Sequence, residues 1–181
     1  MKKKLSISLV LFNNEIQLVK NVLNSCIKDV SAKDIYVVDN SINNKLEIIK
    51  SIYDINYFKN KNKGFGQGHN VCFKNFKLLD RYRYTLILNP DTSFKKNTLR
   101  NLVKFLDKNS KVGAVMPKII NFDGSLQFAR RCLPTPAHLI FKKLFPNSKV
   151  SKQYELQENE PTNPVELIAI SGCFMLIRNE I

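Results

Sequence analysis

Three short polar clusters in the sequence bring together side chains that can bind a ligand. They are Asn13-Asn14, Asp39-Asn40-Ser41 and Asn89-Pro90-Asp91. Each cluster directly follows a run of apolar residues that is typical of a strand buried on both faces. Because ligands bind beyond the carboxyl ends of the strands in parallel sheets, the three clusters predict one common site.

A glycine-rich segment at residues 60–68 is a further candidate for ligand binding. Its three glycines alternate with other residues, and glycine permits positive φ angles and a close approach of the backbone to a ligand. A dinucleotide-binding fingerprint would need a glycine where the sequence has His69, and it would follow the first strand rather than the third. The segment therefore does not indicate a nicotinamide site. The alternative interpretation is a plain loop that turns into a helix.

Asp91 offers a hard oxygen ligand for a divalent cation. A lone carboxylate after a strand often caps the next helix. Thr92, Ser93 and Asn97 are also available as caps, which leaves this carboxylate free for other work. It can hold a cation whose coordination shell is completed by pyrophosphate oxygens. A nucleotide-diphosphate donor would fit a site that combines three parts. These are a place for the nucleobase, a channel lined by glycines and a carboxylate that binds a metal ion.

The elements that must position these residues alternate between strand and helix, which predicts an α/β fold with a mostly parallel sheet. Buried strands are expected at residues 5–12, 34–39, 55–58, 84–88 and 112–116. Apolar residues at helical spacing predict helices at residues 15–28, 44–53, 69–79 and 97–106.

The pattern changes after residue 118. A hairpin turn at residues 121–124, a helix at 136–144, a polar loop at 145–164 and strand-like segments at 165–170 and 173–177 are expected there. We interpret residues 1–181 as a single domain. Residues 1–117 form one half of it and contain the three polar clusters, and residues 118–181 belong to a second half.

The 181-residue chain has 29 Lys and Arg against 15 Asp and Glu, which gives a net charge of +14. This charge favours a polyanionic partner, which is nucleic acid, an anionic membrane surface or a small polyanionic substrate. A solvated lysine-rich surface is the plain alternative. A nucleic-acid-binding protein would depend on charge alone, because the sequence has no recognisable motif for binding nucleic acid. Nucleic acid is therefore not an expected partner.

Length and an apolar content of 44% fit one globular domain. No apolar run approaches the ~18 residues of a membrane span, and the basic start lacks the cleavage site of a signal peptide. The four cysteines are widely spaced without a CxxC pair, which argues against a zinc ribbon or a disulfide scaffold. We expect these thiols to be core or incidental residues. His69 and His138 have no recognisable partner, and we expect them to be structural or exposed. A cytoplasmic location is expected.

Six segments resemble the family 2 glycosyltransferases of GT-A fold. They are ISLVLFN at residues 7–13, VVDNS at 37–41, NKGFGQGHN at 62–70, LNPD at 88–91, QFARRCLP at 127–134 and SGCFMLIR at 171–178. The resemblance spans nearly all of the chain in order and spacing. It is closest to the rhamnosyltransferase-like members that build bacterial surface polysaccharides such as lipopolysaccharide.

The resemblance implies transfer of a sugar from a UDP- or dTDP-sugar to a saccharide or lipid-linked acceptor, with inversion. It also implies that residues 1–117 form a nucleotide-sugar-binding half and that residues 118–181 begin an acceptor-side half. Asp39 would accept a hydrogen bond from a pyrimidine imide N–H. Asp91, the last residue of a variant DxD motif, would bind Mg²⁺ or Mn²⁺, which stabilises the leaving nucleotide diphosphate. The residues implied to contact the nucleotide or sugar are Asn13, Asp39, Asn62, Gly64, Asn70 and Asn89.

Arg130 and Arg131 would bind phosphate oxygens of the donor or of a lipid-pyrophosphate acceptor, because arginine forks bind phosphate bidentately. The alternative is a solvated face. An anionic inner membrane surface is a secondary expected partner, through peripheral association at its cytoplasmic face. The oligomeric state stays open.

The catalytic residue has no assignment in this sequence. In the resembled family the general base lies in an acidic segment after the strand that corresponds to residues 171–178, and this chain ends at Ile181. We therefore expect a chain truncated before that segment. The alternative function is a non-catalytic nucleotide-sugar-binding remnant or a partner subunit of another transferase.

Overall fold

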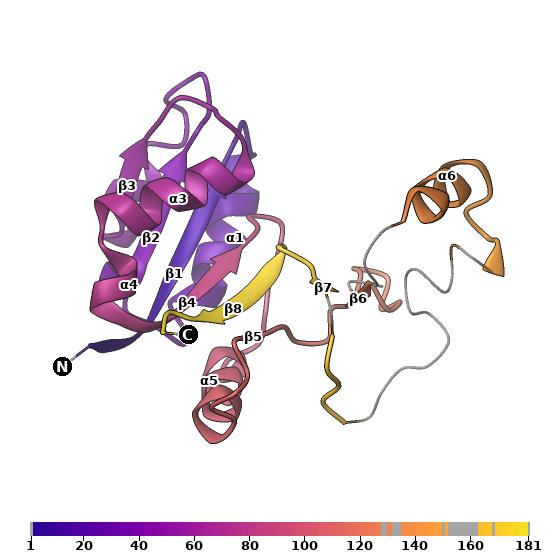
Figure 1. Ribbon diagram of the computed structural model, residues 1–181. Coiled ribbons are helices and arrows are strands. Elements are labelled where there is room, and N and C mark those ends of the chain that lie inside the picture. Colours follow the sequence, from indigo (N-terminus) through magenta and orange to yellow (C-terminus); the bar gives the residue numbers. More distant parts are fainter. Residues whose placement is uncertain are drawn as a thin grey trace. The chain divides into compact units, whose positions relative to one another are not determined.

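The computed structural model describes residues 2–127, 130–131, 135–149, 151, 163–167 and 169–180, with only the backbone at 130, 131 and 139. The chain divides into two compact units (Figure 1). The first unit contains residues 1–115 and 172–181, and the second contains residues 116–171. The assignment of a nucleotide half and an acceptor half stays a prediction, but the last described strand belongs to the first unit.

The first unit is built on a six-stranded sheet with the order β3-β2-β1-β4-β8-β5. Its strands are β1 (Lys3–Leu11), β2 (Ile35–Asp39), β3 (Asn56–Lys59), β4 (Tyr82–Leu88), β5 (Ala114–Val115) and β8 (Phe174–Arg178). Strands β1 to β4 are parallel to one another, and β8 runs antiparallel to both β4 and β5. The mostly parallel sheet predicted from the sequence is thus confirmed.

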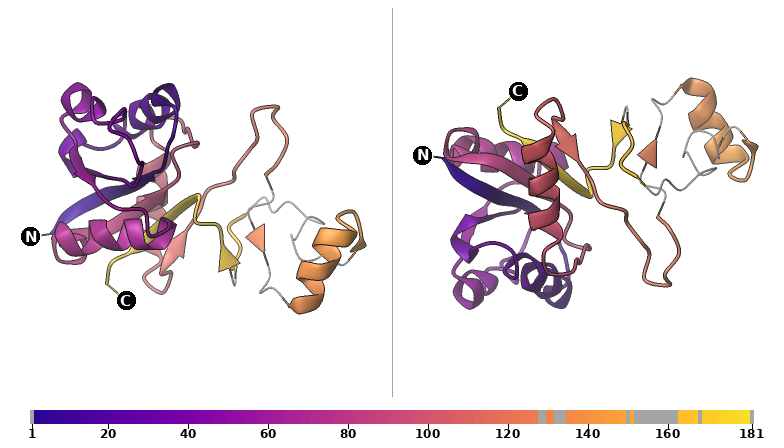
Figure 2. Two further views of the ribbon diagram at one scale, coloured as in Figure 1. Left: turned by 90° about the horizontal axis from the view of Figure 1, so that it is seen from above. Right: turned by 90° about the horizontal axis from the view of Figure 1, so that it is seen from below.

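Helices cover both faces of this sheet. They are α1 (Ile16–Cys26), α2 (Ile49–Tyr53), α3 (Phe65–Asn75), α4 (Leu78–Arg81) and α5 (Thr98–Lys108), with a 3₁₀ turn at Ala32–Asp34. Figures 1 and 2 show α1 and α3 on opposite faces. Val10, Tyr36 and Val38 pack with Cys72 of α3, and the neighbouring strand residues point to the other face because side chains alternate along a strand.

The glycine-rich segment folds differently from its prediction. Helix α3 begins at Phe65 rather than at residue 69, so only the first half of residues 60–68 is a loop. Gly64 makes the turn into the helix with a φ of 95°, and its N–H donates to Asn62 Oδ1 at 2.9 Å. Gly68 lies against β1, where a Cβ atom would be 2.7 Å from Cγ1 of Val10. This glycine is required for helix packing rather than for a loop.

Three other predicted elements are shorter or interrupted. The helix expected at 69–79 ends at Asn75, and α4 begins after Lys77, which has a left-handed φ of 51°. The helix expected at 44–53 is helical only at Ile49–Tyr53. The strand expected at 112–116 is reduced to Ala114–Val115.

The second unit contains a hairpin, a helix and two short strands. Gly124 N–H donates to the Asn121 carbonyl at 3.0 Å, which confirms the turn at 121–124. Helix α6 (Pro136–Leu144) has the predicted bounds, and β6 (Arg130–Arg131) pairs antiparallel with β7 (Ala169–Ile170). Most of the polar loop expected at 145–164 lies outside the described residues. No helix in the described ranges is long and apolar enough to cross a bilayer.

Candidate functional site

The polar clusters after β1 and β2 meet at the carboxyl edge of the sheet. Leu11 and Asp39, the last residues of these strands, are partners in the parallel register. Beyond them, Asn13 N–H donates to Ser41 Oγ at 2.7 Å, and Asn13 Oδ1 accepts a 3.4 Å bond from Ile42 N–H. Asn13 itself is exposed with a left-handed φ of 53°. The structure therefore brings the first two clusters into direct contact.

Asp39 is fully buried at this edge and is surrounded by donors. Its Oδ1 accepts from Ser41 N–H at 2.8 Å, and its Oδ2 accepts from the Tyr57 hydroxyl at 2.5 Å and the Lys59 ammonium at 2.9 Å. Burial alone would raise the pKa of this carboxyl, but these hydrogen bonds outweigh it and hold the pKa below its usual value. Asp39 is therefore ionised at neutral pH.

A depression of about 550 Å³ opens beside this carboxylate. Its lining residues are Asn40, Ser41, Ile42, Lys59, Asn60, Lys61 and Asn62. They come from the ends of β2 and β3, and Asn60 Nδ2 donates to Asn40 Oδ1 at 3.1 Å across the gap between the two strands. The depression is thus lined by amide groups and lysine ammonium groups, which suit an anionic, hydrogen-bonding ligand.

The sequence interpretation did not single out Tyr57, Lys59 or Asn60. A signal for two of them was present, because Lys59 and Asn60 also follow a predicted strand and β3 is the neighbour of β2. Tyr57 has no such signal. Its hydroxyl reaches Asp39 only because the register pairs Val37 with Tyr57 on the same face of the sheet.

The remaining nucleotide-side residues lie at the same edge or on α3. Asn62 is joined to Gly64 by the 2.9 Å bond that begins α3, and Asn70 is exposed in the second turn of that helix. Asn89 follows β4, and its N–H donates to the Cys173 carbonyl at 2.9 Å. Asp91 is exposed in the turn after Asn89.

Asp91 is not the cap of the following helix. The N–H groups of Asn97 and Leu99 at the start of α5 donate to Asp29, at 2.7 and 3.0 Å. Thr92, Ser93 and Asn97 were available as caps, but the carboxylate that caps α5 comes from the turn after α1. In the described ranges no three His, Cys, Asp or Glu side chains gather to hold a metal ion.

The arginines of the segments at 127–134 and 171–178 lie in different units of the chain. Arg130 and Arg131 form β6 in the second unit. Arg178, at the end of β8, is directed to the end of α5 instead, where its guanidinium donates to the carbonyls of Leu106, Asn109 and Val112. Arg178 therefore joins a helix to the sheet.

His69 is a buried, neutral side chain. It is 3% exposed, and its Nδ1 lies 2.7 Å from Ser8 Oγ on β1. Burial lowers its pKa to about 4. His138 belongs to α6, where it forms a capping box with Thr135. Both histidines thus have a structural contact, as do Cys26 and Cys72 in the core, whose pKa values are raised by burial.

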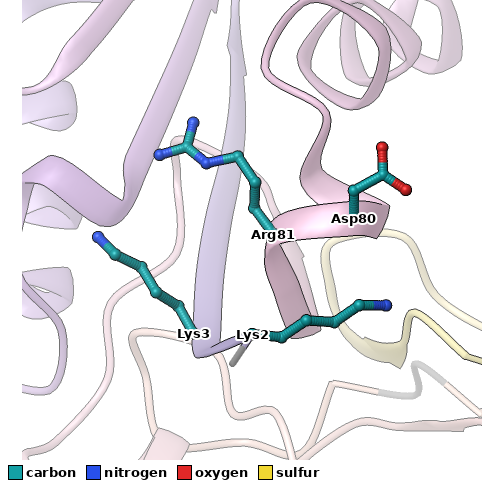
Figure 3. Close-up of a pocket in the computed structure, with 4 residues that line it drawn as sticks. All are labelled: Lys2, Lys3, Asp80 and Arg81. Atoms are coloured by element: carbon teal, nitrogen blue, oxygen red, sulfur yellow. The ribbon is translucent and has the colours of Figure 1, made fainter.

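A second depression, of about 360 Å³, lies at the opposite edge of the sheet. Figure 3 shows its four lining residues, Lys2, Lys3, Asp80 and Arg81, with Lys3 and Arg81 extending to one side and Lys2 to the other. Lys2 pairs with Glu180 at 2.5 Å and Lys3 with Asp34 at 2.7 Å. Two of its three cations are thus neutralised within the protein.

Comparison with known proteins adds a family and a fold. The family model described as glycosyl transferase family 2 matches residues 6–180. No curated protein sequence matches the chain. Among solved structures, S. aureus TarS 1-349 in complex with UDP-GlcNAc is 23% identical, with a TM-score of 0.54 over 70% of this chain and 38% of that one.

Two further structures have the same architecture. GalNAc-T7 with UDP, GalNAc and Mn²⁺ is 18% identical, with a TM-score of 0.62 over 98% of this chain and 35% of that one. The mannosyltransferase PcManGT from Pyrobaculum calidifontis, in complex with GDP-Man and Mn²⁺, is 18% identical, with a TM-score of 0.50 over 67% and 36%. The chain thus spans less than two fifths of the length of each of these three structures.

Proposed function

The chain belongs to glycosyl transferase family 2 and has the GT-A fold, and from this premise we propose that it binds a nucleotide-diphosphate sugar for sugar transfer. The observation that supports this most directly is the depression at the carboxyl edge, with the buried carboxylate of Asp39 beside it. In α/β sheets this edge is where ligands bind.

Asp39 is the proposed acceptor for the nucleobase. An ionised carboxylate accepts hydrogen bonds only, with about four lone-pair sites, so it suits the imide N–H of uracil or thymine. Three of those sites are engaged by Ser41, Tyr57 and Lys59, and Oδ1 has the remaining one. Because Asp39 is fully buried, we expect the turn after it to shift when a base binds.

Asp91 and the donor diphosphate are proposed to hold Mg²⁺ or Mn²⁺ together. The carboxylate is exposed, is not a helix cap, and supplies a hard oxygen of the kind these ions prefer. The metal would neutralise the charge that develops on the leaving diphosphate. Asn89 is uncharged, so metal affinity would depend largely on Asp91 and on the donor.

The finer assignments are proposals on the same basis. Asn13, Asn62, Gly64, Asn70 and Asn89 are proposed to contact the nucleotide or sugar. Arg130 and Arg131 are proposed to bind phosphate groups of the donor or acceptor. We propose an inverting, rhamnosyltransferase-like enzyme of the cytoplasm that transfers to a saccharide or lipid-linked acceptor.

Calorimetric titration of the 181-residue chain with UDP, dTDP and GDP, with and without Mn²⁺, tests this function. We expect UDP or dTDP to bind, and Mn²⁺ to strengthen binding in the native chain but not in Asp91→Ala. Asp54→Ala is the matched control, because Asp54 is an exposed carboxylate paired only with Lys33 in the described structure. The absence of UDP and dTDP binding at millimolar concentration would overturn the proposal.

A further inference from the structure

We propose that helix α6 binds the surface of an anionic membrane through an exposed apolar stripe. The large side chains of this stripe, with their exposed fractions, are Ile140 (56%), Phe141 (38%), Leu144 (62%) and Phe145 (59%). At 100° per residue, they and the exposed Ala137 occupy a continuous arc of about 140° around the helix. Monomeric proteins rarely expose contiguous apolar patches of this kind without a partner.

Two lysines border the stripe. At the same helical spacing, Lys142 and Lys143 fall on opposite sides of it, each about 130° from its centre. Residues 135–149 contain Lys142, Lys143 and Lys149 and no Asp or Glu. An apolar stripe between cationic borders matches helices that lie in the membrane interface, because lysine stems extend along apolar surface while their ammonium groups reach lipid phosphates.

The helix also has its own local support. Thr135 Oγ1 accepts from His138 N–H at 3.2 Å, and His138 Nδ1 accepts from Thr135 N–H at 3.3 Å. Pro136 occupies the first turn, where its fixed φ favours the helix. Phe141 and Phe145 contact each other with ring centroids 6.0 Å apart. The apolar stripe is thus presented by a helix with a capped N-terminus.

Charge complementarity favours a lipid surface, rather than a second copy of the chain, as the partner of the apolar stripe. Two copies would bring lysine-bordered stripes and two net charges of +14 together, which is repulsive. Anionic lipids instead attract the net positive charge of the chain, while the acyl boundary accepts the apolar side chains. This inference does not depend on the nucleotide site, because α6 and the depression belong to different units.

Co-sedimentation of the 181-residue chain with vesicles tests the proposal. We expect binding to vesicles that contain phosphatidylglycerol and weaker binding to pure phosphatidylcholine. The double variant Ile140→Ser and Leu144→Ser removes two large exposed apolar side chains, so its binding should fall roughly tenfold or more. Ile48→Ser with Ile52→Ser is the matched control in the first unit, where the two side chains are 54% and 48% exposed.

Tryptophan fluorescence reports on membrane contact of α6 directly, without relying on the reduced binding of the serine variants. The chain has no tryptophan, so in Phe141→Trp the tryptophan emission comes from α6 alone. We expect a blue shift on adding anionic vesicles and quenching by brominated lipid. An unshifted emission, equal binding of the double variant, or vesicle-free self-association that the double variant abolishes would overturn the proposal. Nucleotide titration of the same proteins reports separately on the proposed function.

Discussion

At the amino edge of the sheet charged side chains pair with one another, whereas at the carboxyl ends of β2 and β3 polar groups line an open depression. At the amino edge Lys2, Lys3 and Lys4 each have an acidic partner within 3.0 Å. At the carboxyl edge the amides of Asn40 and Asn60 face the depression. The ion pairs at the first edge hold its lysines within the protein. At the second edge the single 3.1 Å bond between Asn60 and Asn40 uses only part of the hydrogen-bonding capacity of the two amides, which leaves groups available to a ligand.

The two edges also differ in how their central carboxylate is held. Asp34 at the amino edge accepts from Tyr82 and from Lys3, whose side chain is more than half exposed. Asp39 at the carboxyl edge is fully buried and accepts from three groups. A charge held in this way is costly to bury, and proteins retain such charges chiefly where they bind or react. The difference supports the carboxyl edge as the functional one.

The largest expected effect is a loss of nucleotide affinity that occurs when the carboxyl edge is changed and not when the amino edge is changed. Asp39→Asn replaces an acceptor-only oxygen with an amide, so affinity for UDP or dTDP should fall roughly tenfold to a hundredfold, the range for a hydrogen bond to a charged group. The matched change at the other edge, Asp34→Asn, should leave affinity unchanged. Calorimetry on both variants checks this. Equal losses in the two variants would show that the edges do not differ in function.

Acid unfolding should reveal His69, which lies below the carboxyl edge on α3. Its pKa is about 4 in the folded chain against about 6.5 when unfolded, so the unfolded chain binds more protons between these values. Stability should therefore fall as the pH falls through this window, by as much as about 3 kcal/mol. Urea unfolding at several pH values measures the slope, and His69→Gln should flatten it.

The titration of Asp39 contributes little to the change in stability between pH 4 and 6.5. Its folded pKa is below the unfolded value of 3.8, so its contribution to stability is present above that pH and is lost only at lower pH. If the slope between pH 4 and 6.5 persists in His69→Gln, another group is responsible for it.

A pair of glycine variants tests how tightly α3 is packed behind the site. Gly68→Ala places a Cβ atom 2.7 Å from Val10, so we expect a loss of about 1–3 kcal/mol in the free energy of unfolding. Gly66→Ala meets nothing within 4 Å and should stabilise the helix by up to about 1 kcal/mol. Thermal unfolding of both compares them. Equal effects would mean that α3 does not approach β1 closely.

Local patterns in the sequence predicted the sheet and two of the clusters at its edge, because buried strands read as apolar runs and strand ends as polar residues. Long-range contacts were beyond such patterns. Asp29 caps α5 across some 70 residues, and Tyr57 reaches Asp39 only through the strand register. The early start of α3 was missed for a physical reason, since Gly66 and Gly68 resemble a loop until the closeness of Val10 is known.

The smallest expected effect completes the comparison at the amino edge. Lys3→Gln removes the 2.7 Å ion pair with Asp34, but an exposed pair of this kind contributes less than about 1 kcal/mol. Asp34 keeps its 2.7 Å bond from the Tyr82 hydroxyl, so no buried group loses its last partner. Chemical denaturation in low and high salt measures the change, which should shrink as salt screens the native pair. A loss as large as that of Gly68→Ala would place the amino edge among the tightly held parts of the fold.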